Sequence, residues 1–229
     1  MLQSDYNRDI AARHIGVNAF SCFVVAVFGW KARHLIYKEF SAKVPHNRVY
    51  LYDPQAARIM LYFAAFQIKN FFDSLKWNEG PEFLMHHVLA AGSSLGGLVP
   101  HPTFHFYAIF YMGISEFSTA VLSLLANFDD VHGAKGLGDA FPLVKAILGG
   151  FFVVLFISIR VFAWSILTYR YFSDVWTIQR HRNDFDYQRR KTFIRWNSVS
   201  LGLVTLLQIV WLFEVLKVCQ LEMAKLGML

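Results

Sequence analysis

The sequence predicts an all-α membrane protein with about six transmembrane helices. Hydrophobic residues make up 55% of the 229 residues, charged residues only 17%, and the mean hydropathy is +0.36. Such a composition is typical of a chain whose solvent is lipid. The long apolar runs are continuous, whereas a membrane β-barrel would show alternating segments of about ten residues. A soluble fold and a β-barrel are therefore both disfavoured.

Each predicted span is a mostly apolar run between charged or helix-breaking residues. A helix needs roughly 20 such residues to cross a hydrocarbon layer of ~30 Å. Six runs meet or approach this length, at residues 15–30, 56–72, 83–99, 103–126, 143–169 and 197–213. Pro81, Pro100 and Pro102 limit the third and fourth runs, because proline cannot donate to the preceding turn. The predicted organisation is an N-terminal tail of residues 1–14, a membrane domain of residues 15–218 and a C-terminal tail of residues 219–229.

The connections between the runs carry uneven charge. Five Lys or Arg fall within residues 31–54 and seven within residues 170–196. Positive charge favours the cytosolic or matrix side, so these connections are predicted to face it and both termini to face away. Residues 170–196 also contain seven aromatic residues, and we expect this segment to lie against anionic headgroups. A nucleic-acid partner is not expected, because it would need a basic surface free of the membrane.

Ionisable residues within the spans are the candidates for function. Each costs about 2.5–3.5 kcal/mol to insert, so it usually faces a partner inside the bundle. An antiparallel turn near His101 would bring His86 and His87 to the depth of Glu116. The end of the second run would add Lys69 and Asp73, whereas Arg160 is expected nearer the opposite face.

Two interpretations of this cluster stay open. In the first, one imidazole acts as a general base and Glu116 or Asp73 orients its ring. In the second, the polar groups pair only to hold helices together, since the bilayer offers no water. Only one of His86 and His87 can point into the cluster, because adjacent helical residues diverge by ~100°. A metal site is not predicted, since the nine histidines are scattered over several depths.

Several short motifs together resemble one family. His86-His87 opens the third run, Phe104-His105-Phe106-Tyr107 and the Ile-Ser-Glu-Phe-Ser-Thr stretch at 114–119 lie in the fourth, and residues 156–160 lie in the fifth. This pattern, over residues 56–213, resembles the TLC-domain family, which includes the ceramide synthases. The resemblance implies a ring or barrel of six helices enclosing a cavity for an acyl chain or other lipid. It makes His86, His87 and Glu116 candidate catalytic residues, and Lys69, Asp73, Ser118, Thr119 and Arg160 candidate lipid-binding residues.

The sequence departs from the synthases at a second motif. They carry a His-Asp-x-x-Asp element downstream of the His pair, and the comparable stretch here, residues 111–119, lacks it. The resemblance is therefore to the non-synthase branch, and we expect a protein that binds or handles membrane lipid without the full acyltransferase motif. One version of this expectation makes the chain an accessory subunit of a larger membrane complex.

Two alternative functions stay open. One is a ceramide-synthase-like N-acyltransferase, for which acyl-CoA would be a substrate and no cofactor is expected. The other is a small transporter. The resemblance implies the endoplasmic reticulum membrane, with the mitochondrial inner membrane as the alternative.

Overall fold

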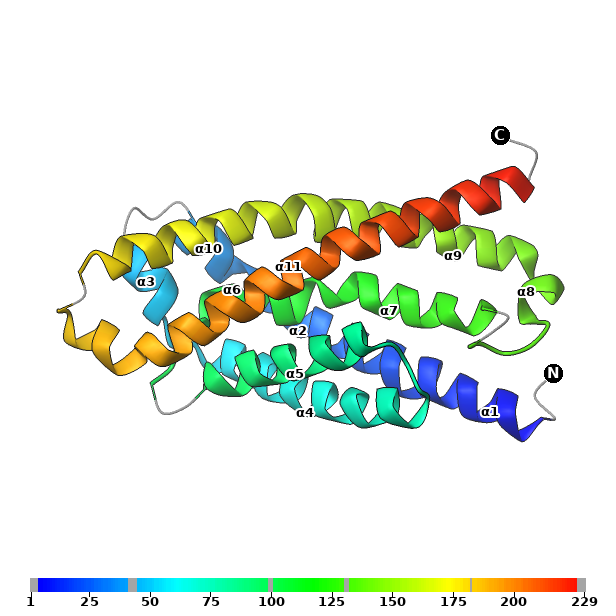
Figure 1. The fold of residues 1–229 in the computed structure, drawn as a ribbon, viewed down its shortest axis with the longest axis horizontal. Coiled ribbons are helices and arrows are strands. Elements are labelled where there is room, and N and C mark those ends of the chain that lie inside the picture. Colours follow the sequence, from blue (N-terminus) through cyan, green and yellow to red (C-terminus); the bar gives the residue numbers. More distant parts are fainter. Residues whose placement is uncertain (1–3, 41–44, 99–100, 130–131, 182, 226–229) are drawn as a thin grey trace.

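The fold is a bundle of six long helical rods that run alternately in opposite directions (Figure 1). The computed structural model describes residues 4–40, 45–98, 101–129, 132–181 and 183–225, and within them every regular element is helical. The start of α1 (Asp5–Ala11) and the end of α11 (Phe185–Lys225) lie at one end of the bundle. The helix α3 (Pro45–Tyr50), the end of α10 (Trp164–Gln179) and the start of α11 lie at the other. This arrangement confirms the prediction of an all-α membrane protein.

Most of the rods combine several helical segments. The first consists of α1 (Asp5–Ala11), the π-helical η1 (Ala12–Ala19) and α2 (Phe20–Phe40). The second is α4 (Pro54–Lys76) and the third is α5 (Pro81–Gly96). The fourth consists of α6 (His105–Ala108), the π-helical η2 (Ile109–Ile114), α7 (Glu116–Leu125) and the 3₁₀ turn η3 (Ala126–Phe128). The short α8 (Leu137–Ala140) follows. The fifth rod consists of α9 (Pro142–Leu155), the π-helical η4 (Phe156–Ala163) and α10 (Trp164–Gln179). The sixth rod is α11 (Phe185–Lys225).

Four of the described helices are long and apolar enough to cross a membrane. They are Asp5–Phe40, His105–Phe128, Pro142–Gln179 and Phe185–Ala224. Of the other two rods, α4 contains Arg58, Lys69 and Asp73, and α5 has only 16 residues. These two pack against each other as an antiparallel pair on one side of the bundle (Figure 1).

The rods extend beyond the predicted spans. Residues 5–14, expected in a tail, are helical. The Tyr6 ring packs against Trp77, and Arg13 forms an ion pair with Glu79. These two contacts hold the start of the first rod against the α4–α5 connection. At the other terminus α11 continues to Lys225. The predicted ends at Val99, Pro100 and residues 226–229 lie outside the described residues. The described parts of residues 170–196 belong to the end of α10, the start of α11 and the connection between these helices, and their place against headgroups stays a prediction.

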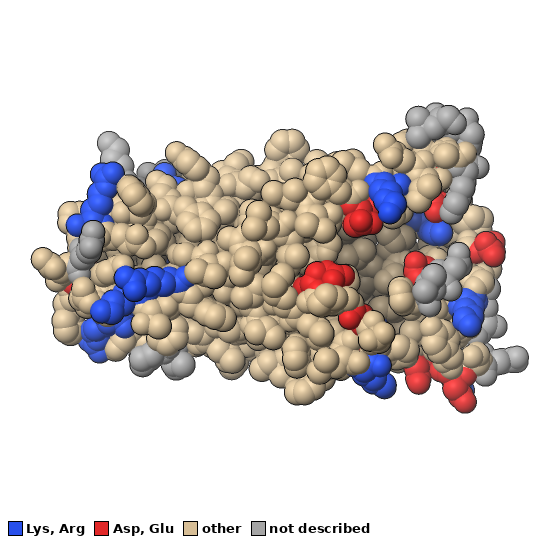
Figure 2. All heavy atoms as spheres, in the orientation of Figure 1, with Lys and Arg blue, Asp and Glu red and all other residues tan. Residues whose placement is uncertain are grey.

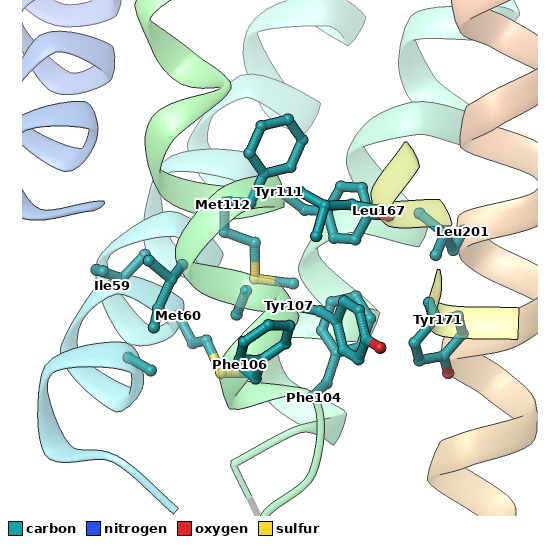
Figure 3. Packing of buried hydrophobic residues seen from close by; sticks show 14 of the residues in the cluster. Ile59, Met60, Phe104, Phe106, Tyr107, Tyr111, Met112, Leu167, Tyr171 and Leu201 are labelled. Atoms are coloured by element: carbon teal, nitrogen blue, oxygen red, sulfur yellow. The ribbon is translucent and has the colours of Figure 1, made fainter. Parts of the chain in front are cut away.

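The fourth rod supplies much of the aromatic core. Phe106, Tyr107 and Ile109 are fully buried. Phe104 stacks on Tyr111 with ring centroids 5.8 Å apart, and Tyr107 packs edge-on against Tyr171 at 5.0 Å. Figure 3 shows these rings between α4 on one side and α11 on the other.

A buried ion pair fixes the end of the bundle that contains α3. Arg48 donates to Asp174 from Nε at 2.6 Å and from Nη2 at 2.7 Å, and it also donates to the carbonyl of Glu39 at 2.9 Å. The Tyr107 hydroxyl donates to the same carboxylate at 2.5 Å. Because such a two-pronged pair is geometrically specific, it locks α3, α10 and the fourth rod together. Sequence reasoning did not single out Arg48 or Asp174 as a pair.

A glycine pair lets the first and fourth rods touch. A Cβ on Gly29 would lie 2.8 Å from Gly113 Cα and 2.6 Å from the backbone nitrogen of Ile114. No side chain fits there, because the obstacle is backbone. Small residues are the usual means of close helix approach in membranes.

Candidate functional site

An ion pair between two rods lies in the middle of the bundle. Arg160, on η4, donates from Nη2 to Glu116 Oε1 on α7 at 3.0 Å, and both side chains are less than a tenth exposed. The same guanidinium donates to Ser118 Oγ at 3.0 Å and to Thr119 Oγ1 at 2.7 Å. The Cys22 thiol donates to the other carboxylate oxygen at 3.5 Å. The Arg160 guanidinium is therefore held by a carboxylate and two hydroxyl groups.

This geometry corrects one prediction from the sequence. Arg160 was expected nearer the opposite face from Glu116, but it is bonded directly to it. The prediction counted residues along the fifth run from a start near Leu143, whereas helical structure continues to Gln179. Arg160 therefore lies close to the middle of the rod, at the depth of Glu116.

A small cavity opens beside the ion pair. Its volume is about 40 Å³, and its lining comes from α4, α5, the fourth rod, the fifth rod and α11. Apolar side chains such as Phe63, Leu89 and Trp164 make up most of the wall. The polar members of the wall are His86, Ser93, Tyr111, Glu116, Arg160, Asn197 and Ser200. His86 and Glu116 thus reach one cavity, as the depth argument predicts.

Several polar atoms of this wall have no hydrogen-bond partner among the described residues. They are His86 Nδ1, both amide atoms of Asn197 and Ser200 Oγ. Asn197 is 1% exposed and Ser200 is 2% exposed. A buried polar atom without a partner costs about 1–3 kcal/mol, and buried polar groups in proteins are almost always bonded. These atoms are therefore placed to bond something that enters the cavity.

The remaining predicted site residues form a second cluster, towards the chain termini. His87 Nδ1 lies 2.6 Å from Gln67 Oε1. Lys69 forms an ion pair with Asp73 at 2.6 Å and donates to Asn18 at 2.7 Å. The predicted single cluster is thus two clusters, with His86 at the first and His87 at the second, and their rings are 5.4 Å apart. The two imidazoles diverge because they are adjacent on one helix.

The second cluster continues to the connection between α4 and α5. Arg13 pairs with Glu79 and lies 3.8 Å from Asp73. Ser74 Oγ donates to Glu79 at 2.5 Å. This continuous ion-pair network ties η1 to α4 and to the α4–α5 turn, and it keeps Asp73 and Lys69 away from Glu116.

π-Helical turns occur in three rods beside the first cluster. The segment η1 leads into the turn that holds Cys22, η2 leads into Glu116, and η4 contains Arg160. A π-helical turn inserts an extra residue and rotates the following side chains, and such turns are frequent at functional sites. They account for the convergence of Cys22, Glu116 and Arg160 on one point.

Among the described residues, no three His, Cys, Asp or Glu lie together as a metal site requires. His105 is used structurally. Its Nε2 lies 3.2 Å from the Gly97 carbonyl oxygen, and its Nδ1 lies 3.2 Å from the backbone nitrogen of Asp53. It therefore closes the connections that flank α4 and α5.

Comparison with known families assigns most of the bundle. The family model of the TLC domain, described as TRAM, LAG1 and CLN8, matches residues 13–217. The chain belongs to the TLC-domain family. Comparison with curated proteins and with solved structures gives no match. In this TLC domain the cavity, the Glu116–Arg160 pair and the second cluster all fall inside the matched residues.

Sequence reasoning missed the contribution of α11 to the site. Asn197 and Ser200 stand three residues apart at the start of the sixth run, which put them on one helical face. That face points inwards and continues to Gln208, whose amide atoms are also buried without partners among the described residues. The sixth run has no charged residue, so a search for ionisable groups did not find Asn197 or Ser200. Buried amides at helical spacing were the available signal.

Proposed function

We propose that this TLC-domain protein binds a membrane lipid and takes the lipid's polar group into the cavity beside Glu116 and Arg160. One observation carries the proposal: His86, Asn197 and Ser200, which hold buried polar atoms without a partner among the described residues, all line this cavity. Family membership supports a lipid-related role in a multi-pass membrane protein. The cavity volume of about 40 Å³ suits a small hydrogen-bonding group or two to four waters.

The charge of the site favours an uncharged polar group. Glu116 and Arg160 neutralise each other, and the guanidinium is already bonded to three oxygens. An additional phosphate or carboxylate would bring a net charge into hydrocarbon without a free cation. The amide of Asn197 and the hydroxyl of Ser200 can each donate and accept. A hydroxyl, ester or amide group satisfies them.

Lipids that co-purify with the protein test this proposal. The full chain is purified in mild detergent, and its retained lipids are identified by mass spectrometry. We expect a defined neutral lipid that is lost from Asn197→Leu combined with Ser200→Ala. The matched control is Ser158→Ala, because Ser158 is exposed and bonds only the carbonyls of its own helix. Equal lipid retention in the cavity variant and the control would exclude the site.

A finer version places the protein in the endoplasmic reticulum membrane, with the mitochondrial inner membrane as the alternative, as an accessory subunit of a larger complex. The likeness to ceramide synthases supports this location. Mild extraction followed by native sizing tests the subunit role. Migration as a single chain of 26.4 kDa with its micelle would exclude it.

A second candidate function is N-acyl transfer from acyl-CoA to a long-chain amine. It is favoured by His86, whose Nδ1 is unpartnered in the cavity and could accept the amine proton. The arrangement differs from the predicted one, because Glu116 bonds Arg160 and so does not orient an imidazole. Purified protein incubated with labelled acyl-CoA and a long-chain amine should form product that His86→Ala abolishes. Absence of product, or unchanged product in the variant, removes this candidate.

A further inference from the structure

The two ends of the bundle differ in charge. At the end that contains α3, the described parts of residues 31–58 and 165–196 hold eleven Lys or Arg and five Asp or Glu. Figure 2 shows blue side chains gathered at this end, and red side chains mixed with blue ones towards the opposite end. We call the α3 end the basic end.

Most cations of the basic end have no carboxylate partner. Among the described residues, no Asp or Glu lies within 4.0 Å of the charged groups of Lys31, Arg33, Arg58, Arg180, Arg189, Lys191 or Arg195. At the opposite end Arg8, Arg13, Lys69 and Lys145 form ion pairs, whereas Lys76, Lys135 and Lys217 form none with the described residues. The positive charge of the basic end is therefore available to a partner outside the chain.

Exposed aromatic rings stand beside these cations. The guanidinium of Arg180 lies 5.8 Å from the ring of Trp176, and that of Arg189 lies 5.0 Å from the ring of Phe185. Trp176 is 63% exposed and Phe185 is 68% exposed. Aromatic side chains favour the headgroup level of a bilayer. Each ring therefore holds its cation at the depth where lipid phosphates lie.

The start of α11 extends this surface into the bilayer. Arg195 is exposed one and a half turns beyond Arg189, and Lys191 lies between them. The long stems of Arg and Lys let their charges reach the headgroups from such a position. Because α11 continues from here into an apolar run, the partner must be a membrane surface rather than a soluble molecule.

We propose that Arg180, Arg189 and Arg195 form a binding site for the phosphate-bearing headgroups of anionic phospholipids. Each cation near an anionic surface strengthens lipid binding by roughly fivefold. The site is separate from the central cavity and does not depend on the proposed function. It also orients the protein, with the basic end against the more anionic leaflet.

Selective lipid retention tests this site. The full chain is equilibrated in mixed micelles of phosphatidylcholine with a minor fraction of phosphatidylserine, and the bound lipids are counted by native mass spectrometry. We expect enrichment of phosphatidylserine in the wild type, and a loss of about tenfold or more in the triple variant Arg180→Gln, Arg189→Gln, Arg195→Gln. The three residues are exposed and form no ion pair, so this variant should fold.

Two controls complete the test. A triple variant of exposed cations at the opposite end, Lys76→Gln, Lys135→Gln and Lys217→Gln, should keep the enrichment. The triple variant Arg180→Lys, Arg189→Lys, Arg195→Lys should also keep the enrichment, which separates the effect of charge from any effect on folding. Unchanged enrichment in the basic-end triple, or equal loss in both Gln triples, would overturn the proposal.

Discussion

The ion pair between Glu116 and Arg160 offers the sharpest test of the site's energetics. In Glu116→Leu the guanidinium loses its carboxylate and keeps only Ser118 and Thr119. Removing one partner of a buried pair costs about 3–5 kcal/mol, because the other charge stays buried without compensation. A guanidinium cannot lose its proton in a protein, so this cost cannot be avoided by neutralisation.

The reverse substitution should be milder. In Arg160→Leu the carboxyl group of Glu116 can take up a proton, and Cys22 still lies 3.5 Å from it. The remaining loss is that of hydrogen bonds to a buried group, about 1–3 kcal/mol. In the double variant the charges are gone together, so we expect it to be more stable than Glu116→Leu alone.

Unfolding in detergent measures these differences. The free energy of unfolding is obtained for the wild type, both single variants and the double variant under the same conditions, and the four values form a double-mutant cycle. We expect a coupling energy of about 2 kcal/mol or more. Additivity within about 0.5 kcal/mol, or a larger loss from Arg160→Leu than from Glu116→Leu, would refute the reasoning.

The other predictions concern helix packing, the buried Arg48–Asp174 ion pair and the orientation in the membrane. Gly29→Ala should lower stability by about 1–3 kcal/mol through overpacking, whereas Gly149→Ala should be neutral, since nothing lies within 4 Å of its added Cβ; equal thermal melting of both variants would contradict this. Asp174→Asn should destabilise the fold by about 3 kcal/mol or more, because Arg48 is 1% exposed and would keep its charge. An unchanged melting temperature would contradict a stabilising role of the Arg48–Asp174 ion pair. Protease protection of terminal tags should place both termini on the side away from the cytosol or matrix. Digestion of either tag by protease added on the cytosolic or matrix side would contradict this orientation.

Much of the fold could be predicted because hydrophobic length is read directly from the chain. The fifth and sixth runs form long helices that contain the predicted spans, and the fourth rod, His105–Phe128, covers all but the first two residues of its predicted span. The polar start of the first rod could not be predicted, since its helix depends on contacts of Tyr6 and Arg13 with distant residues. The sequence also did not predict that α10 and α11 extend into the basic, aromatic segment, because its composition fits a separate interfacial helix equally well.

The candidate site was predicted in part. Counting residues from a turn predicted that His86 and Glu116 lie at one depth, and both line the same cavity. It failed for Arg160, whose depth depends on where a long rod begins and on the π-helical turn that contains it. It also merged the Lys69–Asp73 pair with Glu116, because depth alone does not say which way a side chain faces. The uncharged polar groups of α11 needed the structure.

The shortness of α5 has a consequence for the surrounding bilayer. Its 16 residues rise about 24 Å, against a hydrocarbon thickness of ~30 Å. Beside α4 and α5 the lipid tails must therefore compress, or headgroups must sink towards the Arg13–Glu79 network. Such hydrophobic mismatch costs fractions of a kcal/mol per Å and sorts proteins between membranes of different thickness. The same helix that brings His86 to the cavity would thus favour a thinner bilayer around this side of the bundle.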